Sequence, residues 1–180
     1  MNHTILAATL PYLPHLVRIE KAAATMFPLE DLPEPLRSNH TSLADFKHAQ
    51  DDNLLWVAID DSNTPIAFLL ADIIDGCLHI AEFDVHPDYG NRGIGTQLLK
   101  YVLLVAAQRS FPAVILTTFE HLPWNASFYA HHGFTILSDN LIGTEFMEIL
   151  KREKLLGFKR RVSMILRLPP HPTPRIPGHE

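Results

Sequence analysis

The stretch His86-Pro-Asp-Tyr-Gly-Asn-Arg-Gly-Ile-Gly-Thr-Gln-Leu-Leu99 decides how the rest of the chain is interpreted. It follows an apolar, strand-like run, turns through glycines 90, 93 and 95, and continues with apolar residues at helical spacing. Such a turn presents backbone N–H groups at a helix N-terminus, where the helix dipole also favours anions. Gly93 and Gly95 allow a phosphate to approach the backbone closely, and Arg92 adds a positive charge. We therefore predict a diphosphate-binding turn.

Two other phosphate-binding loops do not fit this stretch. Gly90 and Gly95 have the glycine spacing of a P-loop, but Thr96 stands where the phosphate-binding lysine is required. A dinucleotide-binding fingerprint fails because Leu98 occupies the place of the third glycine, and because a strand meander precedes the turn instead of a βαβ unit. A helix-starting turn without a ligand is the alternative that stays open.

The segments around the turn predict a mixed α/β (α+β) fold with a mostly antiparallel sheet. Alternating and continuous apolar runs indicate strands, and apolar residues at helical spacing indicate helices. The strands are expected at 4–9, 54–59, 66–74, 77–85, 113–118, 134–137 and 162–168. The helices are expected at 16–26, 42–50, 93–108, 125–132 and 145–156, with loops filling the rest of the acidic, proline-containing segment 27–53.

Length and composition indicate one globular domain. The 180 residues are 47% hydrophobic and 19% charged, which suits a domain over residues 1–168 followed by a proline-rich tail over 169–180. The single cysteine, Cys77, excludes an internal disulfide. Because no signal peptide and no apolar run of membrane-spanning length are recognisable, we expect a cytoplasmic protein with no membrane partner.

At this point the sequence resembles the GCN5-related N-acetyltransferase (GNAT) superfamily, from about Leu54 to Leu137. The resemblance implies a sheet that opens between strands 77–85 and 113–118 and takes up acetyl-CoA as co-substrate. It also implies that Phe83, Asp84 and Val85 contact the pantetheine. The turn residues Asn91, Arg92, Gly93, Ile94, Gly95 and Thr96 would hold the pyrophosphate. Gly90 departs from the family pattern, since Gln or Arg usually begins this loop.

A second family signature lies in Asn125-Ala-Ser-Phe-Tyr-Ala-His-His-Gly-Phe134, which is similar to a helix ending in Tyr-x-x-x-Gly-Phe. The resemblance implies that Tyr129 protonates the departing thiolate and that Asn125 approaches the pantetheine. The chemistry is consistent, because a phenol with a pKa of about 10 can donate to a thiolate of similar basicity. The alternative is that Tyr129, Phe128 and Phe134 are only core aromatics.

Acetyl transfer to an amine also needs a general base, since an aliphatic amine is mostly protonated at neutral pH. Glu82 is our candidate, directly or through a water. Asp84 is its rival, because the two-residue period of a strand places both carboxylates on one face. A solvated strand carboxylate without a catalytic role is the remaining interpretation. No spacing of His, Cys, Asp and Glu indicates a metal site, and adjacent His131 and His132 point apart on a helix.

Charge is distributed unevenly along the chain. Residues 1–90 have a net charge of −10 and residues 91–180 a net charge of +5. This division suits a cationic acceptor on one side and a phosphate-rich cofactor on the other, or else is ordinary solvated surface. We expect the acceptor to be an amine on a small molecule or a protein, and to approach from the acidic segment 27–53. A homodimer is left open.

Two other functions remain as alternatives. The first is a non-catalytic CoA-binding or regulatory domain with the same fold. The second is a nucleic-acid-binding module that uses the basic segment Lys151–Arg167. We interpret that segment as a helix face and a turn, and we expect no nucleic-acid partner.

Overall fold

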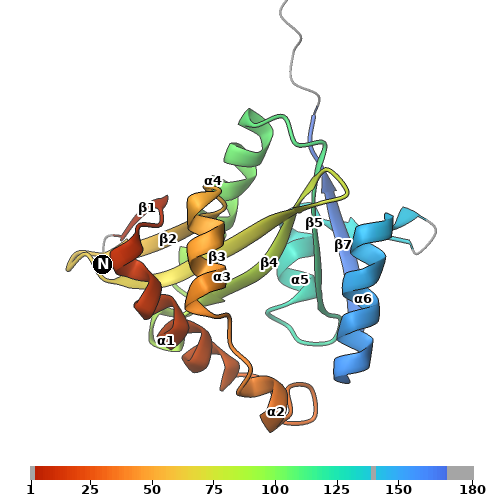
Figure 1. The fold of residues 1–180 in the computed structure, drawn as a ribbon, viewed down its shortest axis with the longest axis horizontal. Coiled ribbons are helices and arrows are strands. Elements are labelled where there is room, and N and C mark those ends of the chain that lie inside the picture. Colours follow the sequence, from red (N-terminus) through yellow and green to blue (C-terminus); the bar gives the residue numbers. More distant parts are fainter. Residues whose placement is uncertain (1–2, 139–140, 170–180) are drawn as a thin grey trace, which may run out of the picture.

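A seven-stranded mixed sheet organises the computed structural model, which describes residues 3–138 and 141–169 (Figure 1). The strands are β1 (His3–Ala7), β2 (Leu55–Asp60), β3 (Pro65–Ile74), β4 (Cys77–Val85), β5 (Ala113–Phe119), β6 (Thr135–Ile136) and β7 (Arg161–Arg167). Their order across the sheet is β1-β2-β3-β4-β5-β7-β6. Only the β4–β5 pair is parallel, and the remaining pairs are antiparallel. The predicted fold class is confirmed.

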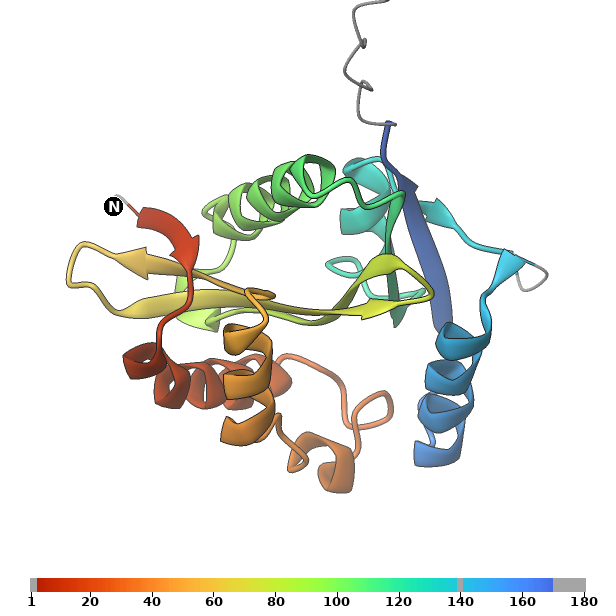
Figure 2. The same cartoon turned by 45° about the horizontal axis from the view of Figure 1, so that its top comes forward.

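Helices cover both faces of the sheet, as Figure 2 shows. On one face lie α1 (Leu13–Ala24), α3 (Leu43–Asp51) and α6 (Thr144–Leu156), with the single turn of α2 (Glu34–Arg37) between α1 and α3 along the chain. On the other face lie α4 (Ile94–Gln108) and the short α5 (Ala126–His131). Two short 3-10 helices, η1 (Leu10–Tyr12) and η2 (Pro87–Tyr89), precede α1 and the glycine turn.

Two apolar clusters explain the continuous apolar runs of the central strands. In β2, Leu55 and Val57 belong to the cluster that contains α1 and α3, whereas Trp56 and Ala58 belong to the cluster that contains α4. Each strand therefore buries both of its faces, which removes the alternation of apolar and polar residues seen in half-exposed strands. Most predicted segment boundaries agree with the structure to within about three residues. The last strand before α6 is shorter than expected, Thr135–Ile136 instead of 134–137.

The sheet opens between β4 and β5. These strands pair only through Leu78↔Val114, His79↔Ile115 and Ile80↔Leu116, although β4 extends to Val85 and β5 to Phe119. Beyond Ile80 the edge of β4 that faces β5 has no neighbouring strand in the described sheet. The opening lies where the sequence predicted it, between segments 77–85 and 113–118.

A bulge in β4 lies at the start of this opening. Leu70 of β3 pairs with Glu82 and Ala71 pairs with Ile80, so Ala81 is an extra residue without a partner on β3. The bulge reverses which side chains face which helices. Ile80 packs in the cluster with α4, whereas Glu82 lies opposite Leu70 of the cluster with α1 and α3. If Ala81 were a regularly paired strand residue, the two-residue period would turn Glu82 and Asp84 to the face of Ile80, toward α4.

Two further expectations concern the C-terminal tail and membrane-spanning segments. The proline-rich tail predicted for 169–180 lies outside the described residues except for Pro169. Among residues 3–138 and 141–169, no helix is both long and apolar enough to span a lipid bilayer.

Candidate active site

A cavity of about 320 Å³ lies beside the glycine turn, where β4 and β5 part. The residues that the sequence assigned to the cofactor gather along its walls, with one exception. Those that line it are Phe83, Asp84, Val85, Asn91, Gly93, Ile94, Gly95, Thr96 and Asn125. Tyr129 and Gly90 line it as well. The structure therefore brings together two sequence signatures that are about 35 residues apart along the chain.

Arg92 is the exception, because it is absent from the walls of this cavity. Its Nη2 donates to the carbonyl oxygen of Asp88 over 2.8 Å, and its guanidinium lies 5.4 Å from the centre of the Tyr89 ring. The sequence placed this cation at the mouth of the phosphate site. In the structure the side chain instead folds back over η2.

The glycine turn has the geometry that an anion site requires. Gly93 has φ of +76° as the N-cap of α4, a conformation that favours glycine, and Asn91 has φ of +57°. The first N–H groups of a helix have no partners within the helix, and the helix dipole places positive potential there. A Cβ on Gly95 would lie 3.4 Å from Val85, so a larger residue would narrow the space between α4 and β4.

Two polar groups point to a ligand in the opening between the strands. The N–H of His86 donates to the carbonyl oxygen of Ile66 on β3, so strand alternation turns the N–H of Val85 toward the edge where β5 has parted. The side-chain oxygen of Asn125 is buried and has no hydrogen-bond partner among the described residues. Its Nδ2 donates to Thr118 over 2.9 Å, which fixes that oxygen in place. A ligand that donates to Asn125 and accepts from Val85 would satisfy both groups.

A second cavity, of about 190 Å³, lies on the α1 side of the same opening. Five residues line both cavities: Phe27, Phe83, Asp84, Asn125 and Tyr129. Glu82 lines only the second cavity. The two spaces therefore adjoin at Tyr129, with the glycine turn on one side and Glu82 on the other.

Three carboxylates on the α1 side of the sheet influence one another. Burial, together with the nearby Glu20 carboxylate, raises the pKa of Glu82 to about 7, and Arg161 only partly opposes this. Burial and the charges of Glu82 and Glu20 raise the pKa of Asp84 well above its ordinary value. Burial also raises the pKa of Glu20, although Thr41 donates to its carboxylate from both its N–H and its hydroxyl. Near neutral pH, Glu82 is the member of this group that can exchange a proton.

Tyr129 is 8% exposed and lies at the junction of the two cavities. Burial and then the charges of Glu82 and Asp84 raise the pKa of its hydroxyl above the ordinary value of 10. The phenol therefore keeps its proton at neutral pH and can act as a donor. Its ring packs 5.5 Å from that of Phe134, so its role in the core and its position at the junction are compatible.

Sequence reasoning missed several residues of the second cavity. Glu20 had a recognisable signal, because it lies on the apolar stripe of α1 with Leu16, Ile19 and Ala23. No sequence signal pointed to Arg37 and His40, because they lie in a segment without regular periodicity. The acids of segment 27–53 do not line the cavity, which corrects the expectation of an acidic approach. That segment contributes Phe27, Leu32, Leu36, Arg37, Asn39 and His40.

A comparison with protein families agrees with this geometry. A model of the acetyltransferase (GNAT) family matches residues 16–134, which is more than half of the chain. The chain belongs to the GNAT acetyltransferase family. The resemblance seen in the glycine turn and in the helix around Tyr129 is therefore confirmed.

Solved structures of GNAT proteins share this fold. A GNAT acetyltransferase from Staphylococcus aureus Mu50 has a TM-score of 0.70 at 15% identity, covering 93% of this chain and 100% of its own. The ribosomal-protein-S18-alanine N-acetyltransferase of Escherichia coli has a TM-score of 0.69 at 17% identity, covering 97% and 99%. The PaiA N-acetyltransferase of Thermoplasma acidophilum, solved with coenzyme A, has a TM-score of 0.66 at 19% identity, covering 93% and 99%.

The raised pKa of Glu82 has a measurable effect on folding. The native state holds this proton up to about pH 7, whereas the unfolded chain releases it near 4.5, so stability falls as pH rises between these values. Between pH 5 and pH 8, the wild type should lose about 1–3 kcal/mol more unfolding free energy than Glu82→Gln. Urea denaturation of both proteins at the two pH values measures this difference. Glu120→Gln, an exposed carboxylate outside both cavities, is the matched control and should follow the wild type. Parallel behaviour of wild type and Glu82→Gln would contradict the assignment.

Proposed function

We propose that this GNAT protein transfers an acetyl group from acetyl-CoA to an amine by direct attack within a ternary complex. The observation that carries the proposal is the junction of the two cavities at Tyr129, with Glu82 on the acceptor side. Direct transfer needs both substrates to meet at one point with a base on one side and an acid on the other. A covalent acyl-enzyme is not part of this proposal, because the described cysteine, Cys77, does not line either cavity.

Residues of the first cavity fit acetyl-CoA. The N–H groups at the start of α4, from Gly93 onward, would hold the pyrophosphate, with Asn91 and Thr96 beside them. Phe83, Asp84 and Val85 would lie along the pantetheine arm, and the unpartnered oxygen of Asn125 would accept from one of its amides. The PaiA relative was solved with coenzyme A, which supports this assignment. Bound in this way, acetyl-CoA supplies an activated acetyl thioester.

Glu82 is the better candidate for the general base. A base works best when its pKa is near the working pH, and Glu82 has a pKa of about 7. Asp84 lines both cavities, whereas Glu82 lines only the acceptor cavity, so Glu82 is the better placed of the two to take the amine proton. In the proposed step, Glu82 takes a proton from the amine, directly or through a water, and frees its lone pair.

Tyr129 and Val85 complete the mechanism. The N–H of Val85 donates to the acetyl carbonyl oxygen and stabilises the negative charge that develops there. As the carbon–nitrogen bond forms and the carbon–sulfur bond breaks, Tyr129 gives its proton to the departing sulfur. As the amide forms, the attacking nitrogen loses its second proton, which replaces the one that Tyr129 gave to sulfur. The products are the acetylated amine and the free thiol of CoA, and Glu82 releases its proton to solvent, which returns the site to its starting charge.

Calorimetric titration with acetyl-CoA, followed by a free-thiol release assay over an amine panel, tests the proposal. Binding together with amine-dependent thiol release is expected. Binding without thiol release for any amine would favour the non-catalytic CoA-binding domain instead. Absence of acetyl-CoA binding would contradict the assignment of acetyl-CoA as the co-substrate.

Replacing Tyr129 with Phe should lower kcat by about 10²-fold or more, because the leaving sulfur loses its proton donor. The dissociation constant for acetyl-CoA should stay within about twofold, since the ring is retained. Steady-state kinetics and calorimetry measure the two quantities. Tyr101→Phe, on an outward position of α4, is the matched control. An unchanged kcat for Tyr129→Phe would exclude the phenol as the acid.

The pH dependence of kcat/KM should separate Glu82 from Asp84. In the wild type the rate should rise with pH through an apparent pKa of about 7, as the group formed by Glu82, Asp84 and Glu20 loses a proton. Glu82→Gln should abolish this limb and lower the rate, whereas Asp84→Asn should retain it. If Asp84→Asn abolishes the limb and Glu82→Gln keeps it, the base is Asp84.

A further inference from the structure

The walls of the acceptor cavity carry both signs of charge, on different elements. Glu20 of α1 and Glu82 and Asp84 of β4 supply the carboxylates. Arg37, at the end of α2, and Arg161, at the start of β7, supply guanidinium groups. The two guanidinium groups would repel a polycation, and the three carboxylates would repel a dianion. An acceptor with one positive and one negative end fits both sets.

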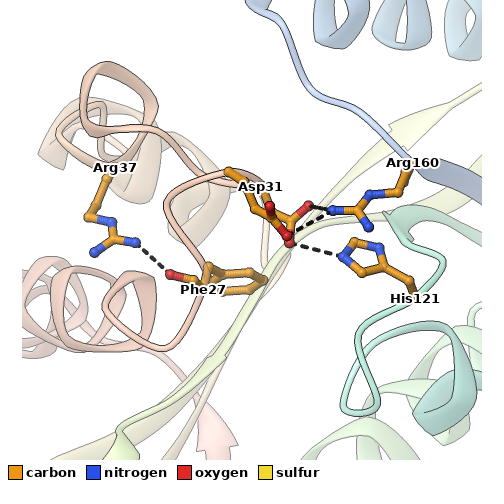
Figure 3. Close-up of polar contacts among 6 residues, drawn as sticks. Phe27, Asp31, Arg37, His121 and Arg160 are labelled. Carbon is orange, nitrogen blue, oxygen red and sulfur yellow. Dashed lines mark hydrogen bonds and ion pairs between the residues drawn. The ribbon is translucent and has the colours of Figure 1, made fainter.

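The two arginines differ in how far their donors are already used. Arg161 is paired with Glu153 through Nε and Nη2, and its Nη2 also donates to Thr117, so it is held by this chain's own acceptors. In Arg37, Nη2 donates to the carbonyl oxygen of Phe27 over 2.5 Å, whereas Nε is buried without a partner among the described residues (Figure 3). A buried donor without an acceptor is costly, and a carboxylate is the group that guanidinium binds best.

A cross-link joins loops that contribute neighbouring residues, Leu32 and Arg161, to the acceptor cavity. Asp31, 2% exposed, accepts from His121 over 2.9 Å and from Arg160 over 2.7 Å (Figure 3). Burial alone would raise the pKa of Asp31, but these hydrogen bonds outweigh it and hold the pKa below its ordinary value. Asp31 therefore stays ionised and joins the segment after α1 to the loop after β5 and the turn before β7. Phe27 packs 5.6 Å from Phe119 across the same space.

The volume of the acceptor cavity favours a small acceptor. Pockets for drug-sized ligands usually have volumes of about 300–1,000 Å³. The acceptor cavity, at about 190 Å³, lies below that range, and Phe27 and Phe119, whose ring centres are 5.6 Å apart, both line it.

From these observations we infer that the acceptor is a small amino-carboxylate, whose amine lies toward Glu82 and whose carboxylate binds Arg37. The inference rests on the proposed acetyl transfer and names the substrate class for the same site. Cationic amines and protein N-termini are the classes that it sets aside.

Matched probes that differ only in the carboxylate test the inference. Thiol release is measured with L-amino acids, with the amides of the same amino acids, and with the corresponding decarboxylated amines, alongside spermidine and a hexapeptide with a free N-terminus. At least one amino acid should have a kcat/KM about 10- to 100-fold above that of its amide and its amine. Calorimetry with acetyl-CoA is run in parallel on the same protein.

The variant Arg37→Gln tests whether the Arg37 guanidinium binds the carboxylate. It should raise KM for that amino acid by about 10- to 100-fold and largely remove the preference over the amide, while the dissociation constant for acetyl-CoA stays within about twofold. Arg152→Gln, an exposed arginine of α6 outside the cavity, is the matched control and should keep the preference. Arg37→Lys should retain part of the preference for the amino acid over its amide.

The outcomes separate this inference from the proposed function. Turnover of spermidine, the peptide or decarboxylated amines in preference to every amino acid overturns the inference and leaves acetyl transfer standing. Preference for amino acids that Arg37→Gln does not reduce overturns the role of Arg37. Binding of acetyl-CoA with no turnover of any carboxylated probe also overturns the inference, whereas absence of acetyl-CoA binding contradicts the proposed function itself.

Discussion

The extra residue in β4 is the constraint on which the site depends. Ala81 has no partner on β3, and β4 and β5 stop pairing at Ile80, immediately before it. A strand that kept its register would have turned Glu82 and Asp84 toward α4 and the cofactor cavity. Because of the bulge, apolar Phe83 and Val85 pack with the α4 cluster, beside the proposed cofactor cavity, and the carboxylates line the proposed acceptor cavity. The same irregularity therefore separates the two cavities chemically and leaves the N–H of Val85 at the open edge.

The electrostatics of the site follow from that placement. Glu82, Asp84 and Glu20 lie near one another in a partly buried space, which disfavours their simultaneous ionisation and destabilises the native state at higher pH. Functional sites often retain such unfavourable groupings, because a carboxylate whose pKa is near neutral can exchange protons at working pH. Arg161, which is 4.7 Å from the Phe119 ring centre, offsets this repulsion only in part, because it is paired with Glu153.

Local sequence signals predicted one side of the site better than the other. The glycine turn and the helix around Tyr129 are continuous motifs with a local backbone geometry. Gly93, Gly95, Asn125 and Tyr129 could therefore be predicted from sequence as neighbours in one cavity, which they line. The acceptor side is assembled from α1, the segment around α2 and β7, which are far apart in the chain. Arg37 and Arg161 are brought to this cavity only by tertiary packing, and no spacing in the sequence predicts their position there.

The bulge and the Arg92 side chain show the limits of the same reasoning. Period-two alternation correctly placed Glu82 and Asp84 on one face, but it carries no information on which face, because Ala81 is as compatible with a regular strand as with a bulge. Arg92 lies in a motif that suggested phosphate binding, yet the nearby Asp88 carbonyl and Tyr89 ring give it local partners. The bulge is decided by the pairing with β3, which lies outside the motif, whereas the partners of Arg92 lie within the motif but are set by its folded geometry.

The central claim is that the opening between β4 and β5, together with the start of α4, forms a CoA site. It is tested most directly by titrating ¹⁵N-labelled protein with CoA, up to about 1 mM, and following the amide resonances. The account predicts that the largest shift changes occur at Val85, at Gly93 and Gly95, and at the side-chain amide of Asn125, with little change on the α3 face. Changes confined to other surfaces, or none at that concentration, would contradict it.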